Sequence, residues 1–232
     1  MSDTKLMLTV ILAIFLFPTC SQNPESETES SRQSILATLK QEAEQGESAA
    51  QIQLGLIYLN GEDVPQDYAE SVRWFRAAAE QGDQRAQVNL GYMYRDGLGI
   101  PQDLAKSVRW YRMAAEQGHA SAQNALGVMY QSGYGVSQDI RESVKWYRMA
   151  AEQGHADAQI QLGLLNANGE GVSQSYVQAY KWFSLASGGS TGKEREGYIK
   201  ARDVAAERMT PEEVVEAQRL ADEWKPKKWE DI

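Results

Sequence analysis

Apolar positions recur along this chain with a helical period, and the same arrangement returns every 36 residues. From Ser48 onward, alanine, leucine and tyrosine stand four residues apart, and this spacing places them on one stripe of an α-helix. The columns are Ala50, Ala86, Ala122 and Ala158; Leu54, Leu90, Leu126 and Leu162; and Tyr58, Tyr94, Tyr130 and, as an exception, Asn166. A repeat of this length predicts an array of similar units rather than one globular core.

A second helix is predicted in each unit, after a turn that glycine begins. The turn glycines are typical left-handed caps of a first helix, at Gly61, Gly97, Gly133 and Gly169. The expected N-caps of the second helix are Asp67, Asp103, Asp139 and Ser175. Three of these are followed by a residue that would complete a capping box, at Glu70, Glu142 and Gln178. The second helices carry a tryptophan followed by phenylalanine or tyrosine, at Trp74, Trp110, Trp146 and Trp182. The pattern predicts helix pairs with aromatic cores.

Glycine also stands inside each predicted first helix, where it costs about 1 kcal/mol relative to alanine. These residues are Gly55, Gly91, Gly127 and Gly163. A cost that is repeated four times indicates a steric need, and we expect another backbone to approach the helix closely at these points.

The columns resemble the Sel1-like repeat family, which is related to the tetratricopeptide repeats. The motifs A-x-x-x-L-G-x-x-Y, G-x-G-V-x-x-D and W-Y/F-x-x-A-A-x-x-G follow one another at constant spacing from Ser48 to about Thr191. The chain departs from the pattern at Asp63, Asn166 and Ser175. The resemblance implies an all-α, right-handed solenoid of antiparallel helix pairs that acts in protein–protein interaction.

The segments outside the repeats give the expected domain boundaries. Residues 34–47 align as a lone second helix that would cap the array, 48–191 form four 36-residue repeats, and 192–232 read as C-terminal capping helices, the second with a capping box at Thr210 and Glu213. Residues 21–33 are acidic and serine-rich, which predicts a disordered linker.

Residues 1–20 have the features of a signal peptide. Lys5 precedes an apolar run from Leu6 to Phe17, which is too short to span a bilayer but matches the core of a secretory signal. Cys20, the only cysteine, ends this segment as in a bacterial lipoprotein signal, although Pro18 and Thr19 depart from that pattern. Lipidation of Cys20 with membrane attachment, ordinary cleavage and an uncleaved anchor all remain open. We expect an exported protein, in the periplasm, anchored to the outer membrane or secreted.

Charge and chemistry exclude several classes of function. The formal net charge is −9, and the basic residues alternate with acidic ones, so a nucleic-acid partner is not expected. His119 and His155 lie one period apart without further ligands nearby, which favours a helix-start role and predicts no metal site. Ser190 and Lys193 match S-x-x-K without its companion motifs, so a hydrolase of cell-wall or β-lactam compounds is only the alternative to a scaffold. No cofactor and no catalytic residue are predicted.

The partner is expected to bind the first helices, which line the concave face of such a solenoid. Residues there that vary between repeats are free to serve binding, and the middle units offer Asn89, Tyr92, Arg95 and Gln131. Tyrosine and arginine often dominate interfaces. The sequence therefore predicts an exported scaffold or adaptor, in envelope assembly, signalling or host contact, that captures a protein in this groove.

Overall fold

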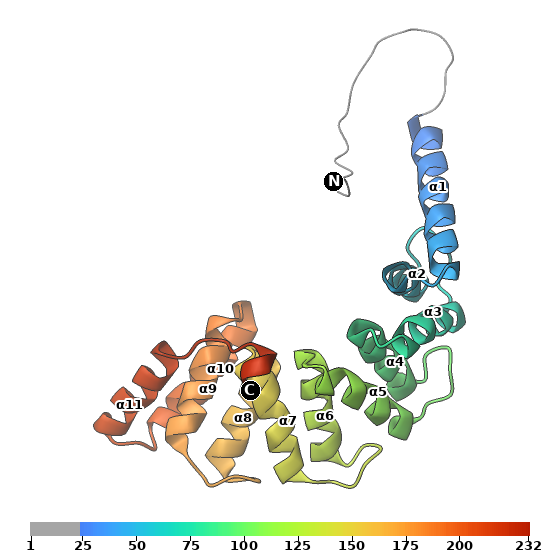
Figure 1. The fold of residues 1–232 in the computed structure, drawn as a ribbon. Coiled ribbons are helices and arrows are strands. Elements are labelled where there is room, and N and C mark those ends of the chain that lie inside the picture. Colours follow the sequence, from blue (N-terminus) through green and yellow to red (C-terminus); the bar gives the residue numbers. More distant parts are fainter. Residues whose placement is uncertain (1–23) are drawn as a thin grey trace, which may run out of the picture. The chain divides into compact units, whose positions relative to one another are not determined.

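All regular elements that the structure describes are helices, which confirms the all-α fold class (Figure 1). The structure is a computed structural model that describes residues 24–232, with side chains from Arg32 onward. The chain divides into two compact units, Met1–Ala37 and Thr38–Ile232. In chain order the elements are α1 (Pro24–Glu44), α2 (Ser48–Asn60), α3 (Tyr68–Glu80), α4 (Gln84–Asp96), α5 (Leu104–Glu116), α6 (Ala120–Ser132), α7 (Ile140–Glu152), α8 (Ala156–Asn168), α9 (Tyr176–Gly188), α10 (Gly192–Ala206), α11 (Pro211–Asp222) and the 3-10 helix η1 (Trp229–Asp231).

The N-terminal part differs from the sequence-based expectation in one respect. Residues 24–33, which fall in the predicted disordered linker, are helical and belong to α1. Proline is well tolerated in the first turn of a helix, and the Glu, Ser, Gln and Arg residues that follow Pro24 can extend it. The predicted signal peptide and Cys20 lie outside the described residues. Within the described part, no helix combines the length and the apolar character that crossing a bilayer requires.

The helix ends form as the turn chemistry predicts, with one exception. The caps of α2, α4, α6 and α8 are glycines with φ of 71–73°, and the N-cap side chains of α3, α5, α7 and α9 accept backbone N–H bonds. The reciprocal half of the predicted capping boxes is absent from the second helices. The Glu70 carboxylate instead pairs with Arg73 at 3.0 Å, and Glu142 pairs with Lys145 at 2.7 Å. The N-cap backbone N–H that a capping box would use already donates to a carbonyl of the preceding first helix, as from Asp67 to Tyr58 at 2.9 Å.

The glycines inside the first helices make room for an aromatic ring, not for another backbone as the sequence suggested. A Cβ atom added to Gly55 would lie 2.5 Å from the ring of Phe75, and one added to Gly127 would lie 2.5 Å from Tyr147. The same contact recurs between Gly91 and Tyr111 and between Gly163 and Phe183. The aromatic residue after each tryptophan therefore seals the core of its helix pair, and all four of these rings are buried.

A ladder of glutamine side chains joins successive repeats. Gln123 Nε2 donates to the carbonyl of Ala115 at 3.1 Å, and Gln153 Nε2 donates to Gln123 Oε1 at 2.7 Å. The same pair of bonds recurs one and two repeats earlier. Gln87 donates to the Ala79 carbonyl and accepts from Gln117. Gln51 donates to the Ala43 carbonyl and accepts from Gln81. Because buried polar groups are hydrogen-bonded in stable cores, this ladder fixes the spacing between adjacent units.

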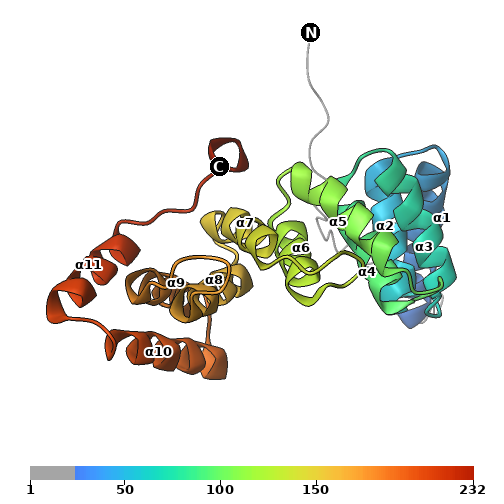
Figure 2. The same cartoon turned by 90° about the horizontal axis from the view of Figure 1, so that it is seen from below.

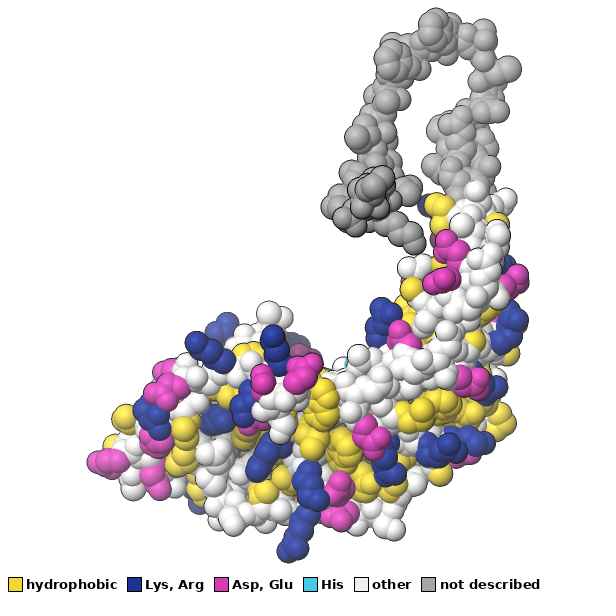
Figure 3. Space-filling view, in the orientation of Figure 1, with side chains coloured by type: hydrophobic (Ala, Val, Ile, Leu, Met, Phe, Trp, Pro, Cys, Tyr) yellow, Lys and Arg dark blue, Asp and Glu magenta, His cyan; other side chains and the backbone are white. Residues whose placement is uncertain are grey.

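The two C-terminal helices, α10 and α11, pack against α9. The predicted capping box of α11 is present, with Thr210 N–H donating to Glu213 at 2.8 Å. On α9, Tyr180 and Phe183 pack in one apolar cluster with Ala205 of α10 and Ala217 of α11. After α11 the chain turns back toward α7, which Figures 1 and 2 both show and the sequence did not indicate. Lys and Arg side chains are interspersed with Asp and Glu on the face seen in Figure 3, as solvated helix faces require.

Candidate functional site

A groove of about 620 Å³ opens over the first helices of the middle repeats. Helix α4 contributes Asn89, Tyr92 and Arg95 to its wall, so three of the four residues that the sequence proposed for partner binding lie together. They share one wall because they are spaced by three residues, which places them on one face of α4. Their role in binding stays a prediction, but the geometry gives them one common cavity.

Arg95 is held in place on this wall by two neighbours. Its guanidinium forms a bidentate ion pair with Asp96, with nitrogen–oxygen distances of 2.7 and 2.9 Å. Its Cζ atom also lies 4.9 Å from the centre of the Tyr92 ring. The hydrogen bonds from Arg95 lower the pKa of the Asp96 carboxyl, so the pair stays ionised near neutral pH. The result is a charge-neutral polar edge beside an aromatic face.

The fourth proposed residue, Gln131, is not part of the groove lining. Its side-chain oxygen accepts a hydrogen bond of 2.8 Å from the Tyr147 hydroxyl, and its carbonyl accepts one from Gln138. Both bonds join Gln131 to residues outside its own helix. The variation of this position between repeats, which suggested a binding role, gives no sign of such contacts. Gln131 serves packing between α6, α7 and the connecting loop.

The groove lining also includes residues of α6, of the loop after it and of α8 that were not predicted from the sequence. Val128 of α6 is 39% exposed, and Tyr134 in the loop after α6 is 52% exposed. His155 and Asp157, at the start of α8, also belong to the lining. The signal for Val128 was available, because it occupies the same variable column as Tyr92. The residues at the start of α8 reach the groove only because of how the next repeat stacks on α6, so the sequence did not indicate them.

The two histidines lie at the starts of α6 and α8, as predicted, but they do not cap these helices through their side chains. Asp83, in the equivalent position before α4, does so by accepting from the backbone N–H groups of Arg85 and Ala86. Burial lowers the pKa of both His119 and His155, so both rings are neutral at pH 7. No cluster of three metal-ligating side chains exists in the part of the chain that the structure describes.

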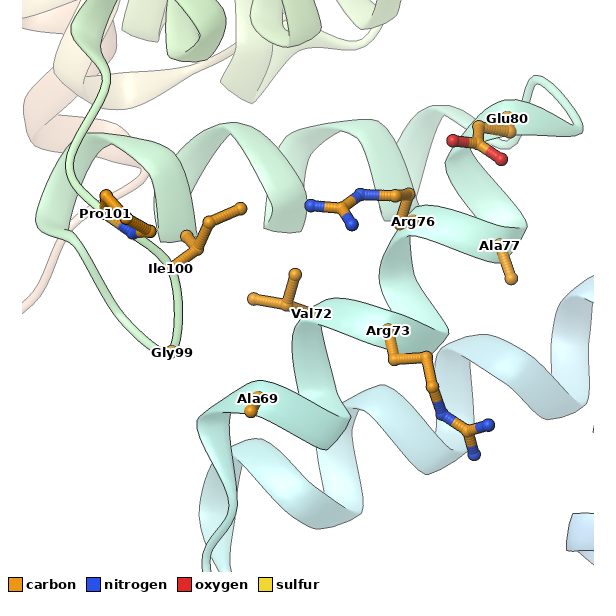
Figure 4. Close-up of a pocket in the computed structure, with 9 residues that line it drawn as sticks. All are labelled: Ala69, Val72, Arg73, Arg76, Ala77, Glu80, Gly99, Ile100 and Pro101. Atoms are coloured by element: carbon orange, nitrogen blue, oxygen red, sulfur yellow. The ribbon is translucent and has the colours of Figure 1, made fainter.

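A second cavity, of about 390 Å³, lies between α3 and the loop that precedes α5 (Figure 4). Val72 and Ile100 face one another across it, and Arg76 lies beside them. The Arg76 guanidinium already donates to the Tyr94 hydroxyl at 3.2 Å, which holds this side chain in the repeat structure. The S-x-x-K match is at the start of α10, where Lys193 is exposed and makes no hydrogen bond to Ser190. Neither place gathers catalytic groups.

The repeats identified in the sequence are matched by a family model. The model of the Sel1 repeat matches residues 48–83, 84–119, 120–155 and 156–188. The chain belongs to the Sel1 repeat family. Sel1 repeats form helix-pair solenoids that generally mediate protein–protein interactions, and proteins built from them are typically non-catalytic scaffolds.

Two solved structures resemble this Sel1 repeat protein closely. One is a protective antigen present in uropathogenic Escherichia coli strains that displays an SLR fold. It is 41% identical with a TM-score of 0.69, and the match covers 81% of this chain and 40% of that one. The other is a Sel1 repeat protein from Oxalobacter formigenes, which is 34% identical with a TM-score of 0.68 and covers 81% of this chain and 76% of that one. This chain therefore spans less than half of the E. coli protein. No curated protein sequence matches it significantly.

Proposed function

We propose that this Sel1 repeat protein is an exported scaffold that captures a protein segment in the groove over α4 and α6. The observation that carries the proposal is that the groove presents exposed apolar surface, at Val128 and Tyr134, next to the ordered Tyr92–Arg95–Asp96 edge. Exposed apolar surface rimmed by polar groups is typical of protein interaction sites. The Sel1 family, with its generally interaction-mediating repeats, supports the same class of function.

The chemistry of the groove favours a segment with one large apolar side chain. Such a side chain would cover Val128 and Tyr134, which lie in a depression rather than on a flat surface. Asn89 lies on the same helix face as Arg95. Its amide donates a hydrogen bond of 2.9 Å to the Arg85 carbonyl of its own helix, a bond that the amide can exchange for one to a bound backbone. The Arg95–Asp96 pair is neutral overall, so this edge of the groove gives a strongly charged segment no electrostatic advantage.

Export is part of the proposal and rests on the sequence of residues 1–20. The short apolar run behind Lys5 supports a cleaved signal, and Cys20 supports attachment to a membrane by lipid. A bacterial envelope scaffold would then work in the periplasm, at the outer membrane or outside the cell. Intact-mass measurement of the protein in each fraction of its source cells tests this. A cleaved, exported chain lacks residues 1–19, and the full-length chain in the cytosolic fraction would refute export.

The groove is tested by the double variant Asn89→Ala and Arg95→Ala. Tyr92 is less suitable for substitution, because it packs against the cluster that contains Phe75 and Leu90 and its loss would disturb the fold. The double variant removes only side-chain groups on the groove wall, so the melting temperature should change little. We expect capture of the partner to weaken about ten-fold or more, or ~1.4 kcal/mol or more, in affinity purification with quantitative readout.

Arg73→Ala is the matched control. Arg73 also pairs with a carboxylate, Glu70, and its Cζ atom lies 4.1 Å from the centre of the Trp74 ring, but it belongs to α3 and lines another cavity. The Arg73→Ala variant should capture the partner as strongly as the unmodified chain does. Equal capture by the double variant and the unmodified chain would refute the groove assignment.

A further inference from the structure

The turn that joins each repeat to the next has the same sequence and geometry four times. The motif A-E-Q-G occupies residues 43–46, 79–82, 115–118 and 151–154. Its glycines have φ of 92–96°, and each glycine N–H bonds to the carbonyl of the alanine three residues earlier. Because the backbone is the same in all four, a segment that fits one turn chemically can fit the others.

The last residues of the sequence show what such a turn binds. The Lys227 backbone N–H donates to the Glu152 carbonyl at 2.8 Å, and the Lys227 ammonium lies 3.2 Å from the Glu152 carboxylate. One repeat earlier, the Trp229 side chain covers Gly118 so closely that an added Cβ would lie 2.3 Å from it. Gly118 is buried as a result, whereas Gly82 in the preceding turn is exposed. An extended segment with lysine and, two residues later, tryptophan thus bridges two successive turns.

The distance between these two turns is set by the glutamine ladder. Gln153 at the Glu152 turn bonds to Gln123, which bonds to the Ala115 carbonyl of the Gly118 turn. Two repeats earlier, Gln81 at the Glu80 turn bonds to Gln51, which bonds to the Ala43 carbonyl of the Gly46 turn, at the same distances to within 0.1 Å. The Glu80 and Gly46 turns therefore form a second pair with the spacing that Lys227 and Trp229 already bridge.

This second pair is open. Among the residues that the structure describes, no other atom lies within 4 Å of a Cβ added at Gly46 or Gly82. Glu80 is exposed and forms no ion pair within the described part of the chain, and Glu47 adds a carboxylate where the Gly118 turn has His119. The Glu80 and Gly46 turns are thus more acidic than the Glu152 and Gly118 turns. A basic segment therefore has a larger electrostatic advantage at the open pair of turns than at the occupied pair.

We propose that the Glu80 and Gly46 turns form a docking site for a partner protein's extended basic segment, in which a lysine pairs with Glu80 and an aromatic side chain two residues later covers Gly46. The segment crosses the turns as residues 227–229 do, with a backbone hydrogen bond to the Glu80 carbonyl. This site is separate from the groove over α4 and α6 and uses none of its residues, so either can fail without the other.

A labelled peptide with the sequence of Lys225–Ile232 is the probe, and its binding to the full chain is followed by fluorescence anisotropy. The chain's own segment keeps the Glu152 pair occupied, because an intramolecular segment acts at an effective concentration of about a millimolar. The free peptide should therefore saturate the open pair, one peptide per chain. Glu80→Lys should weaken binding about ten-fold or more, since it replaces attraction by repulsion.

Glu116→Lys is the matched control, because Glu116 occupies the same column and gives the same change in net charge, but its turn is already covered by Trp229. It should bind the peptide as the unmodified chain does. A peptide with alanine in place of the tryptophan should lose about ten-fold or more in affinity. Absence of saturable binding, or equal loss in both glutamate variants, would overturn the proposal. So would concentration-dependent self-association that Trp229→Ala abolishes, because the occupant would then be a second copy of this chain.

Discussion

The ring of Tyr147 packs directly on the backbone of Gly127, in the space that a side chain at that position would occupy. This contact joins the first and second helices of one repeat, and it recurs in all four repeats with phenylalanine or tyrosine as the ring. The Ser143 hydroxyl adds a hydrogen bond of 2.8 Å to the Gly127 carbonyl, which holds the two helices at this close distance. Glycine occupies this helix position because the Tyr147 ring fills the space that a Cβ atom would need.

Gly127→Ala should therefore destabilise the protein although alanine is the better helix former. The Cβ would overlap the Tyr147 ring, and overpacking of a core costs about 1–3 kcal/mol. Gly197→Ala is the control, because Gly197 lies in α10 and no other atom of the described residues lies within 4 Å of an added Cβ. This variant should stabilise the protein by about 0.5–1 kcal/mol. Urea unfolding of both variants measures the difference. A stabilising effect of Gly127→Ala would mean that the ring does not need the glycine.

The glutamine ladder makes a second prediction about stability. Gln123→Leu keeps a similar side-chain volume but removes the bonds to the Ala115 carbonyl and from Gln153, so we expect a loss of about 1–2 kcal/mol. Gln161→Leu changes the same residue type at a partly exposed position outside the ladder and should stay within about 0.5 kcal/mol. Equal effects in chemical denaturation would show that the ladder does not couple the repeats.

The buried histidines predict how stability depends on pH. Burial lowers the pKa of His119 and His155 below the unfolded value of 6.5, so the unfolded chain takes up protons at a higher pH than the folded chain does. Protonation thus favours unfolding, and the free energy of unfolding should fall as the pH falls below about 6.5. His119→Asn with His155→Asn should flatten this part of the profile, measured by urea midpoints between pH 7.5 and 5.5. A profile that the double variant leaves unchanged would assign the pH dependence to other groups.

The sequence was informative wherever one short segment determines the structure. The glycine caps and the N-caps at Asp67 and its equivalents depend on local backbone geometry, so the repeat boundaries and the helix ends could be predicted. Contacts between distant segments could not. Three such contacts are the Tyr147 ring on Gly127, the hydrogen bond between Tyr147 and Gln131, and the Trp229 side chain over Gly118. Each depends on how one segment of the fold faces another, which the sequence does not show.

The candidate groove shows the same division. Asn89, Tyr92 and Arg95 share one face of one helix, which a helical period is enough to predict. Val128 lies in the same variable column as Tyr92 but on the next first helix, and His155 comes from the one after. These side chains come together only because successive repeats stack in one way. The buried side chains of the glutamine ladder fix that stacking, and the repeat pattern alone does not reveal their bonds.

Site-specific photo-crosslinking in the source cells shows whether the groove over α4 and α6 holds a protein partner. A photoreactive phenylalanine analogue replaces Val128 inside the groove, and in a second strain it replaces Val215 on α11, which is 70% exposed and lies outside the groove. We expect one discrete protein adduct from position 128, which Asn89→Ala with Arg95→Ala abolishes, and no adduct of that mass from position 215. The same adduct from both positions, or an adduct at position 128 that survives the double variant, would contradict the groove assignment.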